Sequence, residues 1–374
     1  MSRSMDVFTL DPGKISARQL LFIIITVIIS TADVFLPAIV AAIAGRDAWI
    51  SIIIATAEAL VVAAVALALA NRFPQKNLIQ IIQIVLGKWL GWVTAFVFLF
   101  FYFVVLTGNS VAQISVIMKV AFMGSTPLSV FVILMILIAA YAVNQGIEVI
   151  ARVTELLLPL GIGLLFLVGF LLIPRLEMEN YFPIMTEGIG PIFNGATRLL
   201  SFLAEAIIIL MLAPYLNEPK RLGSTLIWSI LLLGGFMFIG VLAIGVFGVQ
   251  QTSIMTFPAL EMVRRIEIGQ YFEHLDAIIV TIWVSGIYLK VVVLYYISCI
   301  GLAQLTGCQS YRSLVIPLGV FVSALSLSWT YDINSLINVI TNSWPSEALL
   351  FQFLIPLILL VIAAVRGLKD EREQ

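Results

Sequence analysis

The chain has 374 residues, of which 61% are hydrophobic and 11% are charged, and its formal net charge is −1. A soluble domain carries roughly 25% charged residues, and the long apolar runs between clustered charges are typical of a polytopic membrane protein. The near-neutral charge excludes the basic field that nucleic-acid binding needs. Cys299 and Cys308 would lie about 13 Å apart along a helix, too far for a disulfide, so they give no indication of the redox compartment.

Ten apolar segments are long enough to cross a bilayer, because a spanning helix needs about 20 mainly apolar residues. The first is too long and too polar in its middle for a signal peptide, so we expect it to remain in the mature protein. The predicted spans are 19–44, 48–70, 89–117, 127–145, 154–173, 191–214, 223–249, 275–304, 313–330 and 349–366.

The basic residues indicate the side on which each loop lies. With the N-terminus inside, thirteen Lys and Arg residues fall in cytoplasmic segments and five in external ones. Because short cytoplasmic loops collect basic residues, this distribution favours both termini inside, which requires an even number of spans. Two external segments, 174–190 and 250–272, are longer than simple turns, and we expect both to fold back over the outer mouth. Residues 76–88 form an amphipathic pattern that fits an interfacial helix or a packed connector.

Four ionisable side chains lie deep within predicted spans: Asp33, Glu58, Glu205 and Lys290. A charge in the hydrocarbon costs about 2.5–3.5 kcal/mol on insertion scales, so such residues normally face a cavity and find partners. Three carboxylates and one ammonium give the membrane interior a net negative charge. This charge favours binding of a proton, a cation or the amino group of a ligand. For Glu58 and Lys290 the alternative is structural pairing between helices.

Spans 1 and 6 show signs of local interruption. Span 1 contains Ser30-Thr31-Ala32-Asp33 followed by Pro37, where side chains compete for backbone hydrogen bonds and proline removes one donor. Span 6 contains Ser201-Phe202-Leu203-Ala204-Glu205, without a Gly or Pro at the expected break. We therefore predict breaks in both spans, with the weaker signal in span 6.

The positions of these two spans favour a transporter architecture. Span 6 lies five spans after span 1. Because five is an odd number, a second five-span repeat begins on the opposite side of the membrane and is inverted relative to the first. Broken helices at matching positions of inverted halves are typical of a midplane site suited to a zwitterion. The predicted fold class is an all-α polytopic membrane protein with ten transmembrane helices, an inverted five-plus-five repeat and discontinuous helices 1 and 6. We expect one membrane domain, 1–374, with repeats at 19–173 and 191–366.

Residues 257–283 form the segment of the chain that most specifically resembles a known protein family. The segment reads Phe257-Pro258-Ala259-Leu260-Glu261, Arg264-Arg265, Gly269, Phe272-Glu273-His274-Leu275-Asp276 and Trp283. It is similar to the membrane-embedded B subunit of bacterial spore germinant receptors, the spore permease family. Further matches, which extend the resemblance over essentially the whole chain, are Gly87-Lys88-Trp89-Leu90-Gly91, Glu187-Gly188-Ile189-Gly190-Pro191, Glu205, Pro214, Asn217, Pro219 and Lys220.

The resemblance implies a relative of the amino acid–polyamine–organocation transporters, with a LeuT-like fold in which spans 1, 3, 6 and 8 line the ligand site. It implies recognition of a nutrient germinant, with an amino acid as the expected ligand, in the spore inner membrane alongside an A subunit and a lipoprotein C subunit. Related transporters often carry a glycine-rich turn in span 1, which this chain lacks. The expected ligand-binding residues are Ser30, Thr31, Ala32, Asp33, Tyr102, Val105, Ser201, Phe202, Leu203, Glu205 and Lys290.

Two functions remain open from the sequence. One is a receptor subunit whose ligand-induced closure is sensed by partner subunits. The other is a proton-coupled amino-acid permease, with Asp33 or Glu205 as the titrating group and Lys290 as its counter-charge. Sensing and transport require the same pocket. An intramembrane enzyme is disfavoured, because the sole histidine, His274, has no HExxH around it and no Gly-x-Ser-x-Gly occurs. We expect neither a metal nor a cofactor.

Overall fold

The computed structural model describes residues 10–266, 276–329 and 333–369, and these residues are almost entirely helical. Within these ranges β-structure is limited to one isolated parallel bridge between Ile15 and Leu216. His274 and the neighbouring part of the 257–283 motif lie outside the described residues.

Nine helical stretches in the described chain are long and apolar enough to cross a membrane. The first stretch, Ala17–Arg72, contains two helices that meet at Gly45, whose positive φ of 57° suits glycine. The result is ten crossings, numbered here as spans 1 to 10. They are α2 (Ala17–Ala44), α3 (Ala48–Arg72), α5 to η3 (Lys88–Phe122), α7 (Leu128–Gln145), α8 with η4 (Ile147–Arg175), α9 to η7 (Ile189–Tyr215), η8 with α11 (Pro219–Ile254), α13 (Asp276–Thr306), α14 (Arg312–Trp329) and α15 to α17 (Ile333–Val365).

Two spans begin earlier than the sequence predicted. Span 5 starts at Ile147 rather than 154, and its first turns carry Glu148 and Arg152, which pair at 3.4 Å on the surface. Span 10 starts at Ile333 rather than 349, because a polar stretch that includes the π-helical segment η9 (Val339–Ser343) is also helical. Hydropathy identifies only the apolar part of a helix, so it missed both polar extensions.

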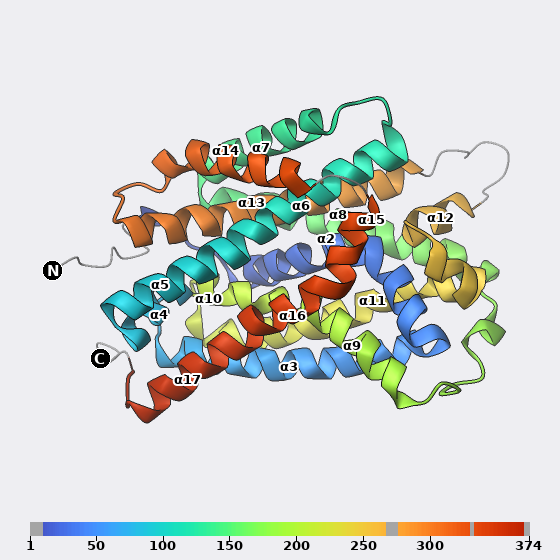
Figure 1. Ribbon diagram of the computed structural model, residues 1–374, viewed down its shortest axis with the longest axis horizontal. Coiled ribbons are helices and arrows are strands. Elements are labelled where there is room, and N and C mark those ends of the chain that lie inside the picture. The colour runs from blue at the N-terminus through green and yellow to red at the C-terminus, as the bar shows by residue number, and fades with distance from the viewer. Residues whose placement is uncertain (1–9, 267–275, 330–332, 370–374) are drawn as a thin grey trace.

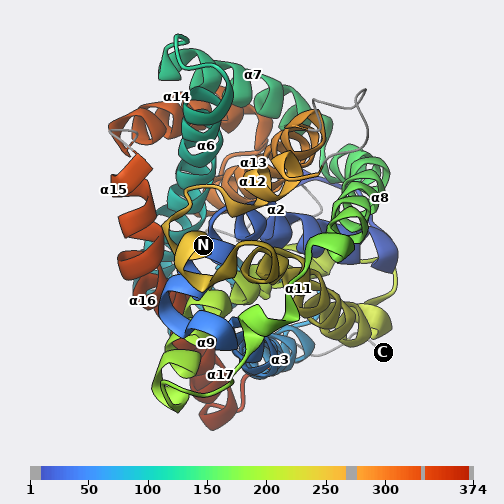
Figure 2. The ribbon, with the colours of Figure 1, turned by 90° about the vertical axis from the view of Figure 1, so that its right-hand side faces the viewer.

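Span 1 occupies the middle of the bundle. Viewed along the bundle in Figure 2, α2 lies at the centre, with α13 and α11 on opposite sides of it, and it packs directly against both. It also packs against α8 and α9. Figure 1 shows most spans running along the long axis of the molecule, with α7 and α14 at its upper edge. A polar side chain on the inner face of α2 is therefore surrounded by other spans.

Helix α4 (Leu78–Leu86) connects spans 2 and 3. It begins with a capping box in which Asn77 and Gln80 exchange side-chain to backbone hydrogen bonds. Its apolar face, which includes Ile81 and Ile82, is fully buried. The connector packs into the bundle, which decides between the two alternatives that the amphipathic pattern left open.

The described parts of both long segments, in 174–190 and 250–266, fold back over an end of the bundle. In the first segment the Tyr181 hydroxyl donates to the carbonyl of Val241 at 3.1 Å. In the second, helix α12 (Pro258–Arg264) packs on spans 1, 7 and 8. The buried Phe257 ring lies 5.9 Å from the ring of Phe35 and 5.8 Å from that of Trp283. Phe257 therefore covers spans 1 and 8 at this end of the bundle.

The segment before span 1, residues 10–16, forms a strap across the ends of other spans. The Ile15 amide donates to the Tyr215 carbonyl, and the Lys14 ammonium donates to the Pro214 carbonyl at 3.1 Å. One Asp11 oxygen accepts from the backbone amide of Ile147 at 3.0 Å and from the Tyr296 hydroxyl at 2.8 Å. This N-terminal strap therefore ties together spans 5, 6 and 8.

Candidate functional site

The centre of the candidate site is a buried ion pair between spans 6 and 8. The Lys290 ammonium lies 2.8 and 3.1 Å from the two carboxylate oxygens of Glu205, and both side chains are 1% exposed. It also donates to the Thr31 hydroxyl of span 1 at 2.7 Å. A buried charge is tolerated when it is paired and hydrogen-bonded. One ammonium therefore connects spans 1, 6 and 8.

Span 6 changes its helix type where Glu205 occurs. The α-helix α9 (Ile189–Leu203) is followed by the 3₁₀ segment η6 (Ala204–Ile208) and then by the short α10 (Ile209–Leu212). The break that we expected at 201–203 begins one residue later, as a tighter winding rather than an unwound turn. A 3₁₀ stretch within a helix often marks a hinge or strain, here at the carboxylate that pairs with Lys290.

The predicted break in span 1 is wrong, because α2 is a continuous α-helix from Ala17 to Ala44. The Ser30 hydroxyl donates back to the Val27 carbonyl at 3.4 Å, which satisfies the side chain without opening the helix. Pro37 stays inside the helix, and its ring packs closely against Gly240 of span 7. Polar side chains and one proline were insufficient to interrupt a helix surrounded by other spans.

A second polar cluster joins spans 3, 6 and 10. The amide nitrogen of Gln352, which is fully buried, donates to the Tyr102 hydroxyl at 3.1 Å and to the Ser201 carbonyl at 3.0 Å. The Tyr102 ring stacks on Trp344 and Phe351 of span 10. Sequence reasoning missed Gln352, although an amide in the middle of the apolar segment 349–366 was an available signal.

The two clusters meet on span 6. Ser201 and Glu205 are four residues apart, about one helical turn. We refer to the combined set as the midplane network, and it connects spans 1, 3, 6, 8 and 10. Its members are Thr31, Tyr102, Ser201, Glu205, Lys290 and Gln352.

The other expected site residues take different positions. Phe202 and Leu203 are buried on span 6 between the two clusters. Val105 lines an apolar groove on the side of the bundle together with Phe321 and Trp329, a groove that contains none of the midplane-network residues. The carry-over by sequence position placed Val105 on the wrong face of span 3, because helix rotation cannot be read from a span boundary.

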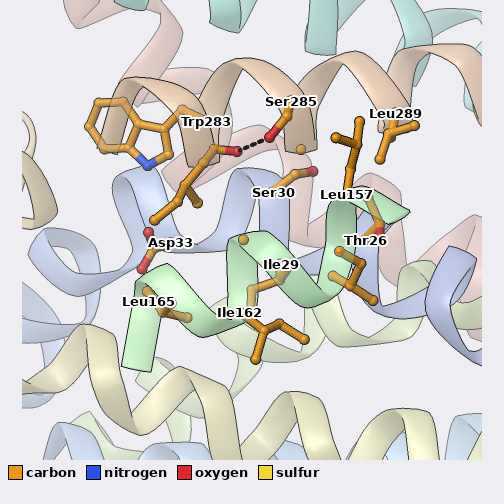
Figure 3. A pocket seen from close by; sticks show the side chains of 14 residues that line it. Thr26, Ile29, Ser30, Asp33, Leu157, Ile162, Leu165, Trp283, Ser285 and Leu289 are labelled. Atoms are coloured by element: carbon orange, nitrogen blue, oxygen red, sulfur yellow. Dashed lines mark hydrogen bonds between the residues drawn. The ribbon is translucent and has the colours of Figure 1, made fainter. Parts of the chain in front are cut away.

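Asp33 lies beside two small cavities. One, of about 40 Å³, is shared with Ser30 and Trp283; Figure 3 shows the Trp283 indole and the Asp33 carboxylate at the same end of it. The other, of about 30 Å³, is shared with Ala32. These volumes have room for roughly three and two water molecules. Because ligand sites measure ~300–1,000 Å³, these cavities are too small for an amino acid in this conformation.

In the described part of the chain, Asp33 and Glu58, the other two carboxylates expected deep within spans, form no ion pair. Within the described ranges, one oxygen of Asp33, one oxygen of Glu58 and the Trp283 indole nitrogen are buried without a hydrogen-bond partner. Of the three carboxylates that the sequence placed deep within spans, Glu205 is the one that pairs with Lys290 in the described structure. Among the described residues, no group of three or more His, Cys, Asp and Glu side chains is placed to hold a metal ion.

Solved structures identify the fold. The fold is similar to that of Mhp1, a nucleobase-cation-symport-1 family transporter in a closed conformation with bromovinylhydantoin bound. That match has a TM-score of 0.66 and 11% identity, and covers 91% of this chain and 77% of the other. A second neighbour is MhsT in complex with L-phenylalanine, with a TM-score of 0.64, 12% identity and coverage of 93% and 97%. The chain is an integral membrane protein with the LeuT-like transporter fold that the sequence predicted.

The sequence comparison gives the family. Residues 14–334 match the spore permease family, described as spore germination protein, and the chain belongs to that family. Spore germination protein KB of Bacillus subtilis (strain 168) is 25% identical over 373 residues, which cover 98% of each chain. Spore germination protein YndE of the same organism is 25% identical over 296 residues, covering 78% of this chain and 81% of YndE. The resemblance to germinant-receptor B subunits is therefore confirmed.

Proposed function

We propose that the protein is a nutrient-sensing subunit of a spore germinant receptor and that an amino acid binds at the midplane network. The observation that carries this proposal is the buried contact of 2.8 Å between Lys290 and Glu205. Separating such a pair is costly unless each charge finds a new partner. A zwitterionic amino acid supplies a new partner for each of the two charges, because its carboxylate can pair with Lys290 and its ammonium with Glu205. The ligand-bound site would thus keep the same net charge.

Binding in this way requires a change of conformation. The cavities beside Asp33 have room only for water, so the ligand must select or induce a state in which spans 6 and 8 move apart. The ligand shifts this equilibrium by its difference in affinity between the two states. The 3₁₀ segment η6 is suited to act as the hinge.

The setting of this proposal follows from the family and the charge distribution. Both termini would lie inside, in the spore inner membrane, and the change of conformation would be sensed by an A subunit and a lipoprotein C subunit. The membrane domain would comprise two inverted repeats, 19–173 and 191–366. Spans 1 and 6, which occupy equivalent places in these repeats, both contribute to the midplane network.

The test is a binding measurement on the purified protein across a panel of amino acids. Lys290→Ala and Ser201→Leu should each weaken binding of the responsive amino acid by at least roughly tenfold, the effect of losing about 1.4 kcal/mol. The exposed Lys220→Ala serves as the matched control and should bind normally. Gel filtration identifies variants that fail to fold. If folded Lys290→Ala and Ser201→Leu both retain full affinity, the proposed site is misplaced.

A proton-coupled amino-acid permease is the second candidate, and the transporter fold of the solved neighbours favours it. Here Glu205 or the unpaired Asp33 would bind the transported proton. Sustained uptake by the protein reconstituted alone would support transport over sensing. In that case Glu205→Gln should abolish pH-driven uptake while binding remains measurable, and unchanged uptake would exclude Glu205 as the proton carrier.

A further inference from the structure

An apolar groove of about 840 Å³ opens on the side of the bundle between spans 3, 9 and 10. Its walls are mainly aromatic, with Phe101 from span 3, Phe321 and Trp329 from span 9 and Phe351 from span 10. The ring of Phe321 packs edge-on against that of Phe100 at 5.9 Å. None of the midplane-network residues lines this groove, although the groove residue Phe351 stacks on Tyr102 of that network.

One charged side chain lies in this apolar groove. Glu347 of α16 (Trp344–Leu349) lines it and is exposed. Within the part of the chain that the structure describes, the Glu347 side chain has neither a hydrogen bond nor an ion pair. The neighbouring surface of span 10 is polar too, because Asn338, Asn342 and Ser346 are exposed at intervals of four residues.

Contacts with Tyr102 give the depth of Glu347 in the membrane. Trp344 stacks on the Tyr102 ring at 6.1 Å, and Gln352 donates to its hydroxyl at 3.1 Å. Glu347 lies between these two residues on span 10, and Tyr102 is near the middle of span 3 (Lys88–Phe122). Figure 1 also shows α16 midway along the bundle. The carboxylate is therefore at mid-membrane depth, where an unpaired charge costs about 2.5–3.5 kcal/mol.

The helices that form the groove are locally widened. Span 3 contains the π-helical segment η2 (Leu99–Val104), which carries Phe100 and Phe101. Span 10 contains the π-helical segment η10 (Leu350–Leu354), which carries Phe351. π-Helical segments are rare overall, and those that occur are often found at functional sites. Two of the helices that line this groove contain one.

We propose that the groove receives a transmembrane helix of a partner protein and that a basic side chain of this helix pairs with Glu347. A lipid acyl chain fills an apolar groove but supplies no counter-charge. A second copy of this chain docked by twofold symmetry brings two Glu347 carboxylates towards each other. A foreign helix with a Lys or Arg at mid-depth satisfies both the apolar walls and the carboxylate, and small or amide side chains can hydrogen-bond to the polar face of span 10.

This inference rests on the partner-signalling part of the proposed function, and it concerns a site separate from the nutrient site, so either can fail alone. The probe is a synthetic poly-leucine helix of membrane-spanning length with one central Lys and a photoreactive leucine beside it. It is added to the full-length protein in lipid vesicles, and all-leucine and central-Glu helices serve as comparisons. Cross-linked residues are identified by mass spectrometry.

The Lys helix should bind roughly tenfold more tightly than the all-leucine helix, and its cross-links should fall on residues that line the groove. Glu347→Gln should remove this preference, whereas Glu58→Gln, which neutralises a membrane carboxylate on span 2, should preserve it. Equal binding of the three helices, a preference that survives Glu347→Gln, or cross-links elsewhere would each overturn the proposal. So would cross-linking between two copies of the chain by a photoreactive residue placed at Phe321, which would indicate self-association. Amino-acid binding measured on Glu347→Gln should be unchanged.

Discussion

Lys290 on span 8 and Glu205 on span 6 are held 2.8 Å apart in a part of the bundle that excludes water from both side chains. The pair fixes the positions of spans 6 and 8 relative to each other, because each buried charge needs the other as its partner. It is also the point at which a charged ligand could replace contacts within the protein by contacts of its own. The first two predictions concern the midplane network built around this pair.

Removal of one charge should destabilise the protein more than removal of both. Lys290→Met leaves Glu205 buried without a counter-charge, which typically costs about 3–5 kcal/mol. The double variant Lys290→Met/Glu205→Leu replaces the pair by apolar groups and should recover most of the loss. Thermal unfolding of the detergent-solubilised protein measures this difference, with the exposed Lys220→Met as control. A double variant that is no more stable than Lys290→Met would contradict the assigned pairing.

Gln352→Leu should weaken the contact between spans 3, 6 and 10. The substitution removes two donated hydrogen bonds and leaves the Tyr102 hydroxyl and the Ser201 carbonyl without this partner, at a cost of about 1–3 kcal/mol. The same thermal assay measures the effect, and the exposed Gln251→Leu is the matched control. Equal stability of the two variants would show that the Gln352 contacts do not contribute.

Phe257 should limit access from the outside to the cavity beside Asp33. Phe257→Ala removes the ring that covers Phe35 and Trp283, so a membrane-impermeant thiol reagent should react faster with a cysteine placed at Ser30. The rate is compared for Ser30→Cys with and without Phe257→Ala, in a background that carries Cys308→Ser. The buried Cys299 provides the baseline. Identical rates would mean that another residue closes this route.

The N-terminal strap should detach when Asp11 loses its charge. Asp11→Asn replaces one acceptor oxygen by a donor, so the amide of Ile147, the amide of Gly13 and the Tyr296 hydroxyl can no longer all be satisfied. Hydrogen–deuterium exchange of the peptide that contains residues 10–16 should accelerate. Glu218→Gln, which alters an exposed acid outside the strap, should leave this exchange unchanged. Unaltered protection in Asp11→Asn would show that backbone contacts alone hold the strap.

The spans and their order could be predicted because each is a long apolar segment, and lipid requires such segments to be helical. The depth of Glu205 and Lys290 followed from counting along these segments. Their pairing could not be predicted, because the choice among three carboxylates depends on how each helix is rotated about its axis. The rotation of span 3 about its axis also explains why Val105 lines the apolar groove, whereas Tyr102 on the same span belongs to the midplane network.

The prediction that span 1 is discontinuous was wrong for a local reason. Serine and threonine hydroxyls can bond within the helix or to a neighbouring span, as Ser30 and Thr31 do, so their presence does not require an open backbone. Gln352 was overlooked because it is a single amide in an apolar segment. Its importance comes from the two groups that other spans bring to it.

The strap has a mechanical consequence for span 8. Tyr296, which holds Asp11, lies six residues from Lys290 on the same helix, about 9 Å along its axis. A rigid rotation of α13 that separates Lys290 from Glu205 also displaces the Tyr296 hydroxyl from Asp11. A separation of the buried ion pair would thus also loosen residues 10–16 at one end of the bundle, without any solute having to cross.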